Sequence, residues 1–205
     1  MKIFIRLLVM IVLILSTFNS RSYSQTSCSA PWFGITKSYI FSAQCTVKVH
    51  LCVYCHPEAP IVDIIAMGLS DVCPDVSAAT IFQFVQWQVL NDYASFCGSK
   101  PCYPGPPLRI NYSIPICVKK SYNYLKNSLS IYSCSNISGN NACYKEFDVC
   151  WNAVPFPGQI SVTPIRCYTY GPSDCPGVEP PPDPKLPWLS DWESPECYEI
   201  ECETF

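Results

Sequence analysis

The longest regular pattern in the chain is an alternation of apolar and polar residues from Tyr39 to Cys55. Odd positions carry aromatic, aliphatic or cysteine side chains, whereas even positions are mostly polar. A repeat of two residues is typical of a β-strand that is buried on one face. A second apolar run, Ile61 to Met67, follows two prolines and ends at Gly68. The two segments are predicted to form a long hairpin around residues 56–60.

Apolar residues then change to a spacing of three and four, which predicts a helix over about residues 77–96. Asp75 or Ser77 can cap the start of this helix, and Gly98 lies where helices commonly end. The apolar stripe is broad, which indicates a helix that packs against a sheet. Its main positions are Ile81, Val85, Val89, Tyr93 and Phe96.

Strand-like alternation returns after a proline-rich loop at residues 99–107. The segment Leu108 to Lys119 alternates throughout. Pro115 cannot donate a backbone hydrogen bond, so this strand is predicted to lie at a sheet edge or to contain a bulge. Further strands are predicted at residues 128–133, 143–151 and 160–168, with Pro164 interrupting the last one.

The order of these elements predicts an α+β fold. Two strands, one helix and three or four strands suggest an antiparallel β-sheet with one packed helix, at about residues 77–96. The regular exchange of strand and helix that marks a parallel, doubly wound sheet is absent from the pattern. A disulfide-linked β-sandwich with a helical insertion is the alternative fold.

Composition divides the chain into three regions. Lys2 and Arg6 precede an unbroken apolar run, and small residues follow it, so residues 1–24 are predicted to be a cleaved signal peptide. Residues 25–173 form the predicted cysteine-rich α+β domain. Residues 174–205 are rich in proline and acidic residues and are predicted to be a C-terminal tail. No membrane span is expected after cleavage, and the protein is predicted to be secreted, extracellular or periplasmic.

All 15 cysteines lie after the predicted signal, which indicates a disulfide-rich protein of an oxidising compartment. Because the number is odd, at least one cysteine lacks an intrachain disulfide partner and is available for a partner chain or a cofactor. Cys134 and Cys143 flank a turn and are candidates for a local disulfide. Cys197 and Cys202 either close a small loop or tie the tail to the domain.

The segment Cys52-Val53-Tyr54-Cys55-His56 matches the C-x-x-C-H pattern and resembles c-type cytochromes over these five residues alone. The resemblance implies haem attachment at Cys52 and Cys55, with His56 as an axial ligand. Alternatively, Cys52 and Cys55 serve a thiol–disulfide oxidoreductase, or are ordinary disulfide cysteines. The last reading is favoured, because a strand sends residues three apart to opposite faces. No catalytic residue, metal site or cofactor is therefore predicted.

Charge limits the choice of partner. After the predicted cleavage, ten basic and sixteen acidic residues remain, so the net charge is about −6. This balance argues against nucleic acid as a partner. Asn111 and Asn136 begin possible glycosylation sequons. We therefore predict a secreted, non-enzymatic protein for extracellular binding or surface structure, with a monohaem electron carrier or an oxidoreductase as alternatives.

Overall fold

The computed structural model describes residues 28–73, 76–134, 142–153, 158–170, 175, 177–178 and 188–202. The predicted signal peptide at residues 1–24 and the sequon at Asn136 lie outside this part of the chain. The fold is mostly β-sheet with few helices, which confirms the general α+β prediction with one packed helix.

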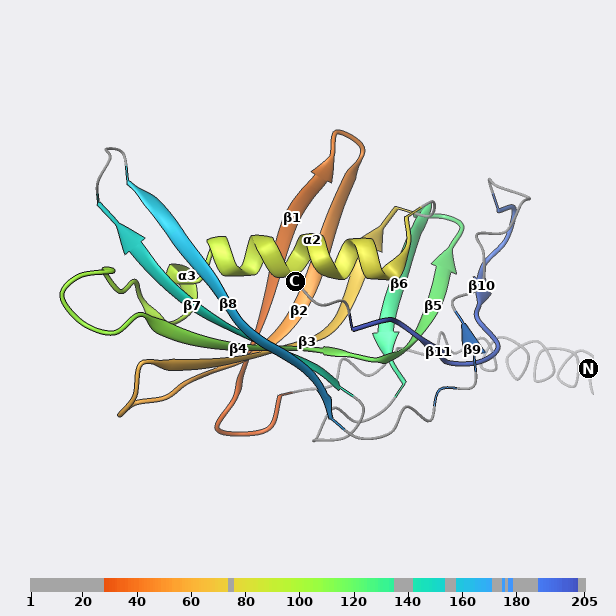
Figure 1. Ribbon diagram of the computed structural model, residues 1–205. Helices are drawn as coiled ribbons and strands as arrows, with labels where there is room; N and C mark the ends of the chain where they lie inside the picture. Colours follow the sequence, from red (N-terminus) through yellow and green to blue (C-terminus); the bar gives the residue numbers. More distant parts are fainter. Residues whose placement is uncertain are drawn as a thin grey trace, which may run out of the picture.

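One branched sheet and one long helix form the structure (Figure 1). The helices are α2 (Ala78–Asn91) and the short α3 (Ala94–Cys97). The strands are β1 (Phe33–Ser42), β2 (Cys45–Cys55), β3 (Ile61–Val72), β4 (Leu108–Pro115), β5 (Cys117–Asn123), β6 (Ser128–Ser133), β7 (Ala142–Asn152), β8 (Gln159–Tyr170), β9 (Gly177–Val178), β10 (Trp192–Glu193) and β11 (Tyr198–Glu199).

The sheet branches at β3. One edge of β3 pairs antiparallel with β2, which pairs in turn with β1. The other edge is divided, because residues 61–65 pair with β4 and residues 68–72 pair with β6. One arm continues from β4 through β7 to β8, and the second continues from β6 through β5 to the short C-terminal strands.

The pairing of β3 with β4 is parallel, whereas the sequence predicted an antiparallel sheet. The reason is the position of the helix. Because α2 lies between β3 and β4 in the chain, it carries the chain back to the end of the sheet at which β3 begins, and β4 then runs in the same direction as β3. The other pairs of long strands in the described residues are antiparallel.

The alternating stretch from Tyr39 to Cys55 is two strands rather than one. The chain turns at residues 43–44, and β1 pairs back onto β2. A register irregularity next to the turn leaves odd residues opposite odd residues, as in the pair Tyr39 and Val47. The apolar face therefore continues through the turn without a change of phase, which hides the turn in the sequence pattern. The hairpin of β2 and β3 is formed as predicted.

Pro115 ends β4 instead of marking a sheet edge. Strand β4 lies between β3 and β7, so the prediction of an edge strand was wrong. The chain bends at Ile116 and enters the other arm of the sheet as β5. A proline at this point stops the ladder of β4 without removing a hydrogen bond from its middle. The predicted interruption at Pro164 is a register irregularity between β7 and β8.

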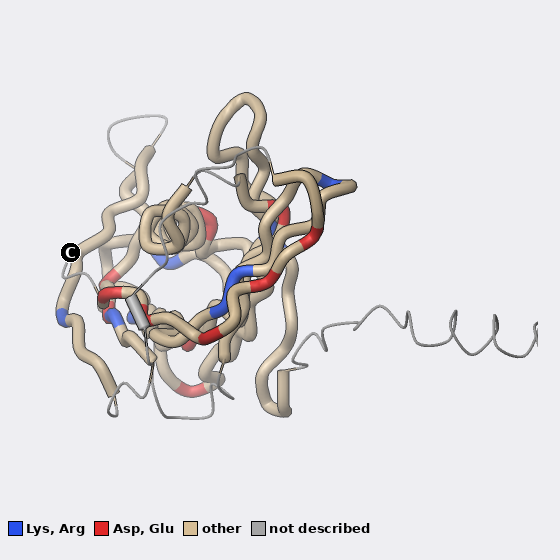
Figure 2. Tube along the Cα trace, turned by 90° about the vertical axis from the view of Figure 1, so that its right-hand side faces the viewer, with Lys and Arg blue, Asp and Glu red and all other residues tan. Residues whose placement is uncertain are grey.

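The sheet curls around α2, as the view along the helix shows (Figure 2). The Ser77 side chain caps the helix by accepting a hydrogen bond from the Thr80 amide, as predicted. The helix packs on β1 through Phe84 and Phe41, whose ring centres are 5.1 Å apart. The residues of the predicted stripe Ile81, Val85, Val89 and Tyr93 are each at most 2 % exposed.

Residues 188–202, here called the C-terminal strap, lie along the open edge of β5. Strand β10 pairs with Ser121 and Tyr122, and β11 pairs with Cys117 and Val118. Trp188, Tyr198 and Ile200 of the strap belong to the hydrophobic core. This part of the predicted tail is therefore integrated into the sheet.

Candidate functional site

Seven disulfides connect the described residues. They join cysteines that are 24 to 63 residues apart in the chain, so each of them crosses between elements. The pairs are Cys28–Cys52, Cys45–Cys73, Cys55–Cys97, Cys102–Cys150, Cys117–Cys175, Cys134–Cys197 and Cys143–Cys202.

The four cysteines singled out from the sequence pair differently from the local arrangements considered there. Cys134 bonds to Cys197 and Cys143 bonds to Cys202, so neither the clamp around the turn nor the small tail loop is formed. The alternative, in which Cys197 and Cys202 tie the tail to the domain, is the one observed. Strand pairing explains the difference, because it brings the strap alongside β5.

The C-x-x-C-H segment closes the end of β2. Cys52 bonds to Cys28, and Cys55 bonds to Cys97 of α3. The sulfur atoms of both cysteines are thus held by other cysteines, and the two do not bond to each other. The His56 Nε2 lies 2.7 Å from Asp63 Oδ2, within hydrogen-bond distance. The Asp63 carboxylate thus lies against one of the two ring nitrogens of His56.

A polar groove of about 770 Å³ crosses the arm of the sheet that carries the strap. Its lining residues come from β2, β3, β6, β5, the turn between β5 and β6, and the strap. They are Lys48, His50, Ser70, Asp71, Ser121, Tyr122, Asn123, Lys126, Ser128, Ser130, Asp191, Trp192 and Glu193.

Strand register arranges the groove as rows across the sheet. Lys48 is opposite Ser70, Ser130 is opposite Ser121, and Ser121 is opposite Glu193. Asn123 and Ser128 form the neighbouring cross-strand pair. These polar positions alternate along each strand with buried residues such as Val47, Leu129 and Ile131, so they share the face that points away from the core.

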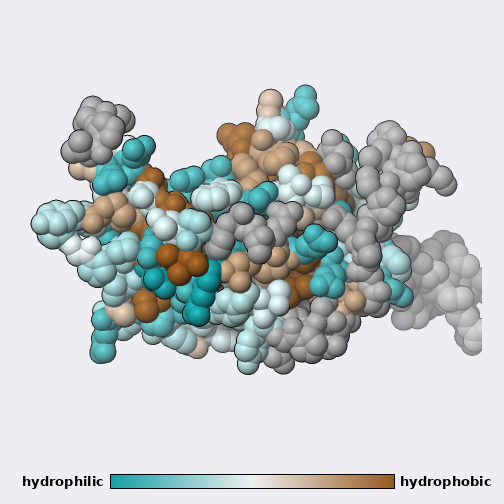
Figure 3. All heavy atoms as spheres, viewed as in Figure 1, coloured by the Kyte–Doolittle hydropathy of each residue, from teal (hydrophilic) through white to brown (hydrophobic). Residues whose placement is uncertain are grey.

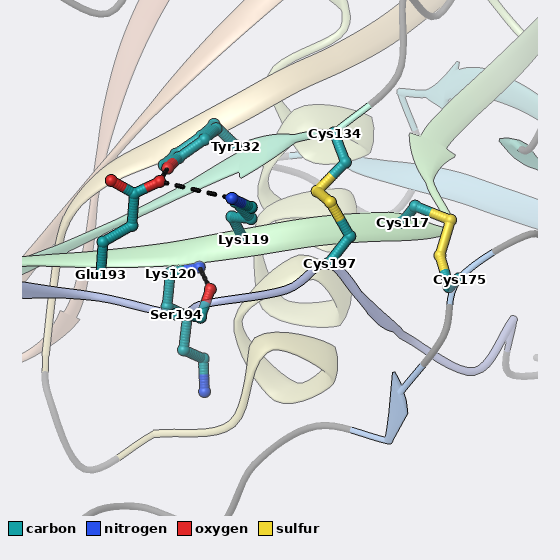
Figure 4. Close-up of a disulfide and its surroundings, with 9 residues drawn as sticks. All are labelled: Cys117, Lys119, Lys120, Tyr132, Cys134, Cys175, Glu193, Ser194 and Cys197. Carbon is teal, nitrogen blue, oxygen red and sulfur yellow. Dashed lines mark hydrogen bonds and ion pairs between the residues drawn. A yellow bond between two sulfur atoms is a disulfide. The ribbon is translucent and has the colours of Figure 1, made fainter. Parts of the chain in front are cut away.

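The charges around the groove largely balance one another. Lys48 Nζ lies 2.6 Å from Asp71 Oδ2. The Glu193 carboxylate accepts a hydrogen bond from the Tyr132 hydroxyl at 2.6 Å, and Lys119 Nζ lies 3.7 Å from the same oxygen (Figure 4). Asp191 accepts a hydrogen bond from the backbone amide of Tyr124. The remaining polar residues of the lining include His50, Lys126, Asn123 and four serines.

The strap forms one wall of the groove and is fixed firmly. Ser194 exchanges two hydrogen bonds with the backbone of Lys120. The Cys134–Cys197 disulfide joins the strap to the end of β6, and Cys117–Cys175 lies beside it on β5 (Figure 4). Trp188 packs between Tyr122 and Trp192, with ring centres 4.7 and 4.9 Å apart. The wall is therefore preorganised, which limits the entropic cost of binding.

His50 of β2 lines the groove and is its histidine. Its Nδ1 lies 3.1 Å from the Thr36 hydroxyl, and its Nε2 lies 3.5 Å from that of Ser70. Burial lowers the pKa of His50 below its usual range, while Asp71 opposes this shift and Lys48 adds to it. The neutral imidazole is thus favoured in the folded protein.

This lowered pKa predicts a pH dependence of stability. Between the pKa of His50 in the folded state and its usual value of about 6.5, the unfolded chain binds more protons than the folded chain. The free energy of unfolding is therefore expected to fall as the pH drops through this range. Urea denaturation of the wild type and of His50→Gln at several pH values from 8 to 5 measures this fall in the free energy of unfolding. A decrease of equal size in both proteins would contradict the assignment to His50.

A second polar row lies on the other arm of the sheet, where Asp63, Asn111 and Glu146 are in register. The Asn111 amide donates to Asp63 at 2.6 Å, so the side chain of the first predicted sequon is engaged in the sheet. Glu146 lies in ion pairs with Arg109 and Arg166, and Arg109 also pairs with Asp148. These groups satisfy one another, and none of them lines the polar groove.

Comparison with protein-family models, curated proteins and solved structures gave no match. Within the described residues, neither helix has the length and apolar character needed to cross a bilayer. The groove must therefore be interpreted from its own chemistry.

Proposed function

We propose that this chain is a secreted, non-enzymatic binding protein, and that the polar groove holds a neutral, hydroxyl-rich ligand of the oligosaccharide class. The observation that carries the proposal is the preformed groove of about 770 Å³, floored by the hydroxyls of four serines and walled by the strap. The predicted signal peptide and the seven disulfides support a secreted protein.

The residue types in the groove favour this ligand class over others. Hydroxyl and amide groups both donate and accept hydrogen bonds, as the hydroxyls of a sugar do. A lipid would leave these side chains unsatisfied, at a cost of about 1–3 kcal/mol for each group buried without a partner. A polyanion would face Asp71, Asp191 and Glu193, which line the groove together with Lys48 and Lys126.

The face of the molecule seen in Figure 3 agrees with a polar mode of binding. Its apolar residues form small groups with polar residues between them. Basic and acidic residues are also mixed along the strands in Figure 2 rather than collected in one field. The trace in Figure 2 thus shows no single basic field of the kind that marks a nucleic-acid surface.

The expected affinity follows from the number of available hydrogen bonds. Each contributes about 0.5–1.5 kcal/mol net. Because the free-energy cost of association offsets much of this gain, we expect weak binding.

The test is a glycan array probed with the exported wild-type protein, followed by calorimetric titration of any bound sugar. Ser130→Gln fills the middle of the groove and is expected to weaken binding at least about tenfold. The matched control is Thr163→Gln on exposed β8, in the other arm of the sheet, which should bind as the wild type does. Absence of any neutral oligosaccharide among the ligands, or equal affinity of both variants, would overturn the proposal.

A further inference from the structure

Three sulfur atoms meet where the end of the strap crosses β7 and β8. Cys143, Cys167 and Cys202 have their Sγ atoms within 4.8 Å of one another. Cys143 and Cys202 form a disulfide, and Cys167 lies outside the seven disulfides of the described residues. The Cys167 Sγ is 3.3 Å from Cys202 Sγ and 4.0 Å from Cys143 Sγ.

The sheet register explains why these sulfurs converge. Cys143 is opposite Thr169, and Cys167 is opposite Lys145, so the two cysteines are diagonal neighbours on adjacent strands. Cys202 reaches both from the strap, which is also held by the hydrogen bond from the Ile200 amide to the Ile116 carbonyl. The strap end therefore stays in place whichever of the two cysteines holds it.

We propose that Cys202 has two alternative disulfide partners, and that exchange moves this crosslink between β7 and β8. The Cys167 thiolate attacks Cys202 Sγ, the Cys143–Cys202 bond breaks, and the Cys167–Cys202 bond forms. Cys143 leaves as a thiolate and takes up one proton for the one that Cys167 released. The number of disulfides is unchanged, and no oxidant or reductant is consumed.

The exchange changes where the remaining thiol lies. With Cys143 bonded, the thiol is that of Cys167, which is half-buried on β8 at the end of the sheet. With Cys167 bonded, the thiol is that of Cys143, which is 1 % exposed. The two isomers thus differ in whether a thiol reagent or a partner cysteine can reach the odd sulfur.

Burial raises the pKa of Cys167, and the nearby Lys145 opposes this shift. Because the thiolate is the attacking form, exchange is expected to be slow at neutral pH and faster at alkaline pH.

The test first stops exchange at acidic pH and unfolds the exported protein in guanidinium, so that a buried thiol also reacts. N-ethylmaleimide then labels the thiols, and mass spectrometry without reduction locates the labels and the crosslinks. In the wild type after incubation at pH 8.5, both the Cys143–Cys202 and the Cys167–Cys202 crosslinks are expected, with the single label divided between Cys167 and Cys143. A label found on Cys167 alone, with Cys143–Cys202 as the only crosslink, would overturn the proposal.

Single cysteine variants give a second test, because exchange predicts how many thiols each of them has. Cys143→Ser is expected to take no label, because Cys167 and Cys202 bond to each other, and two labels would contradict exchange. Cys134→Ser is the matched control, since it removes one member of a disulfide that is not part of the group formed by Cys143, Cys167 and Cys202. It should take two labels, one on Cys197 and one divided between Cys167 and Cys143 as in the wild type. The mapping of the wild type decides the question if Cys143→Ser does not fold.

Discussion

Replacement of both Cys134 and Cys197 by serine is expected to lower the free energy of unfolding by about 4 kcal/mol. The chain-entropy relation gives this value for a loop of 63 residues. The change also frees the strap at the point where it enters β11, so limited proteolysis should cut within residues 188–202 before it cuts the sheet. Guanidinium denaturation and mapping of the first cleavage site measure the two effects.

The matched control is the double serine variant of Cys28 and Cys52, which close a loop of 24 residues. The same relation predicts a smaller loss of about 3 kcal/mol, and the strap should stay resistant to the protease. Equal protease resistance of the strap in the wild type and in the Cys134→Ser, Cys197→Ser variant would show that core packing alone retains it.

Phe147→Ala is expected to lower the free energy of unfolding by about 3–5 kcal/mol. The side chain is fully buried in β7, and its ring centre lies 6.3 Å from that of Trp87 on α2. Truncation leaves a cavity between the helix and one arm of the sheet. Thermal and urea denaturation of the oxidised protein measure the loss.

Tyr170→Ala supplies the control on the neighbouring strand β8. Tyr170 is 55 % exposed and contacts the edge of Tyr144. Its removal should change the free energy of unfolding by less than about 0.5–1 kcal/mol. A similar loss in both variants would show that the helix and the sheet do not share a close-packed core at Phe147.

Much of the secondary structure follows from the periodicity of the sequence, and the errors have local physical causes. The helix and its Ser77 cap were predicted because both depend on neighbours within one turn. The turn at residues 43–44 was missed because the register irregularity keeps the apolar phase. The bend after Pro115 was missed because both β4 and β5 alternate in the same phase, with even positions such as Leu108 and Val118 buried.

The parallel pairing and the branch at β3 could not be predicted, because they depend on which strands meet in space. Disulfide partners have the same limitation. The sequence identified Cys134, Cys143, Cys197 and Cys202 as disulfide cysteines, but sequence proximity suggested the wrong partners.

The polar groove was also absent from the sequence-based predictions. Its residues come from segments between Lys48 and Glu193, and only the cross-strand register places them together. A weak signal does exist, since Ser128 and Ser130 alternate with buried Leu129 and Ile131. Such alternation is common on solvated sheet faces and does not by itself indicate a concave site.

The branch at β3 has a consequence for biosynthesis. Leu69 must find Ile131, and Cys134 must find Cys197, before the second arm of the sheet is complete. Chains dominated by such distant pairings fold in milliseconds to seconds, while disulfide formation takes seconds to hours. Disulfide formation is therefore expected to be the slower step, and an isomerase should raise the rate at which correctly crosslinked product accumulates in a cell-free translation system.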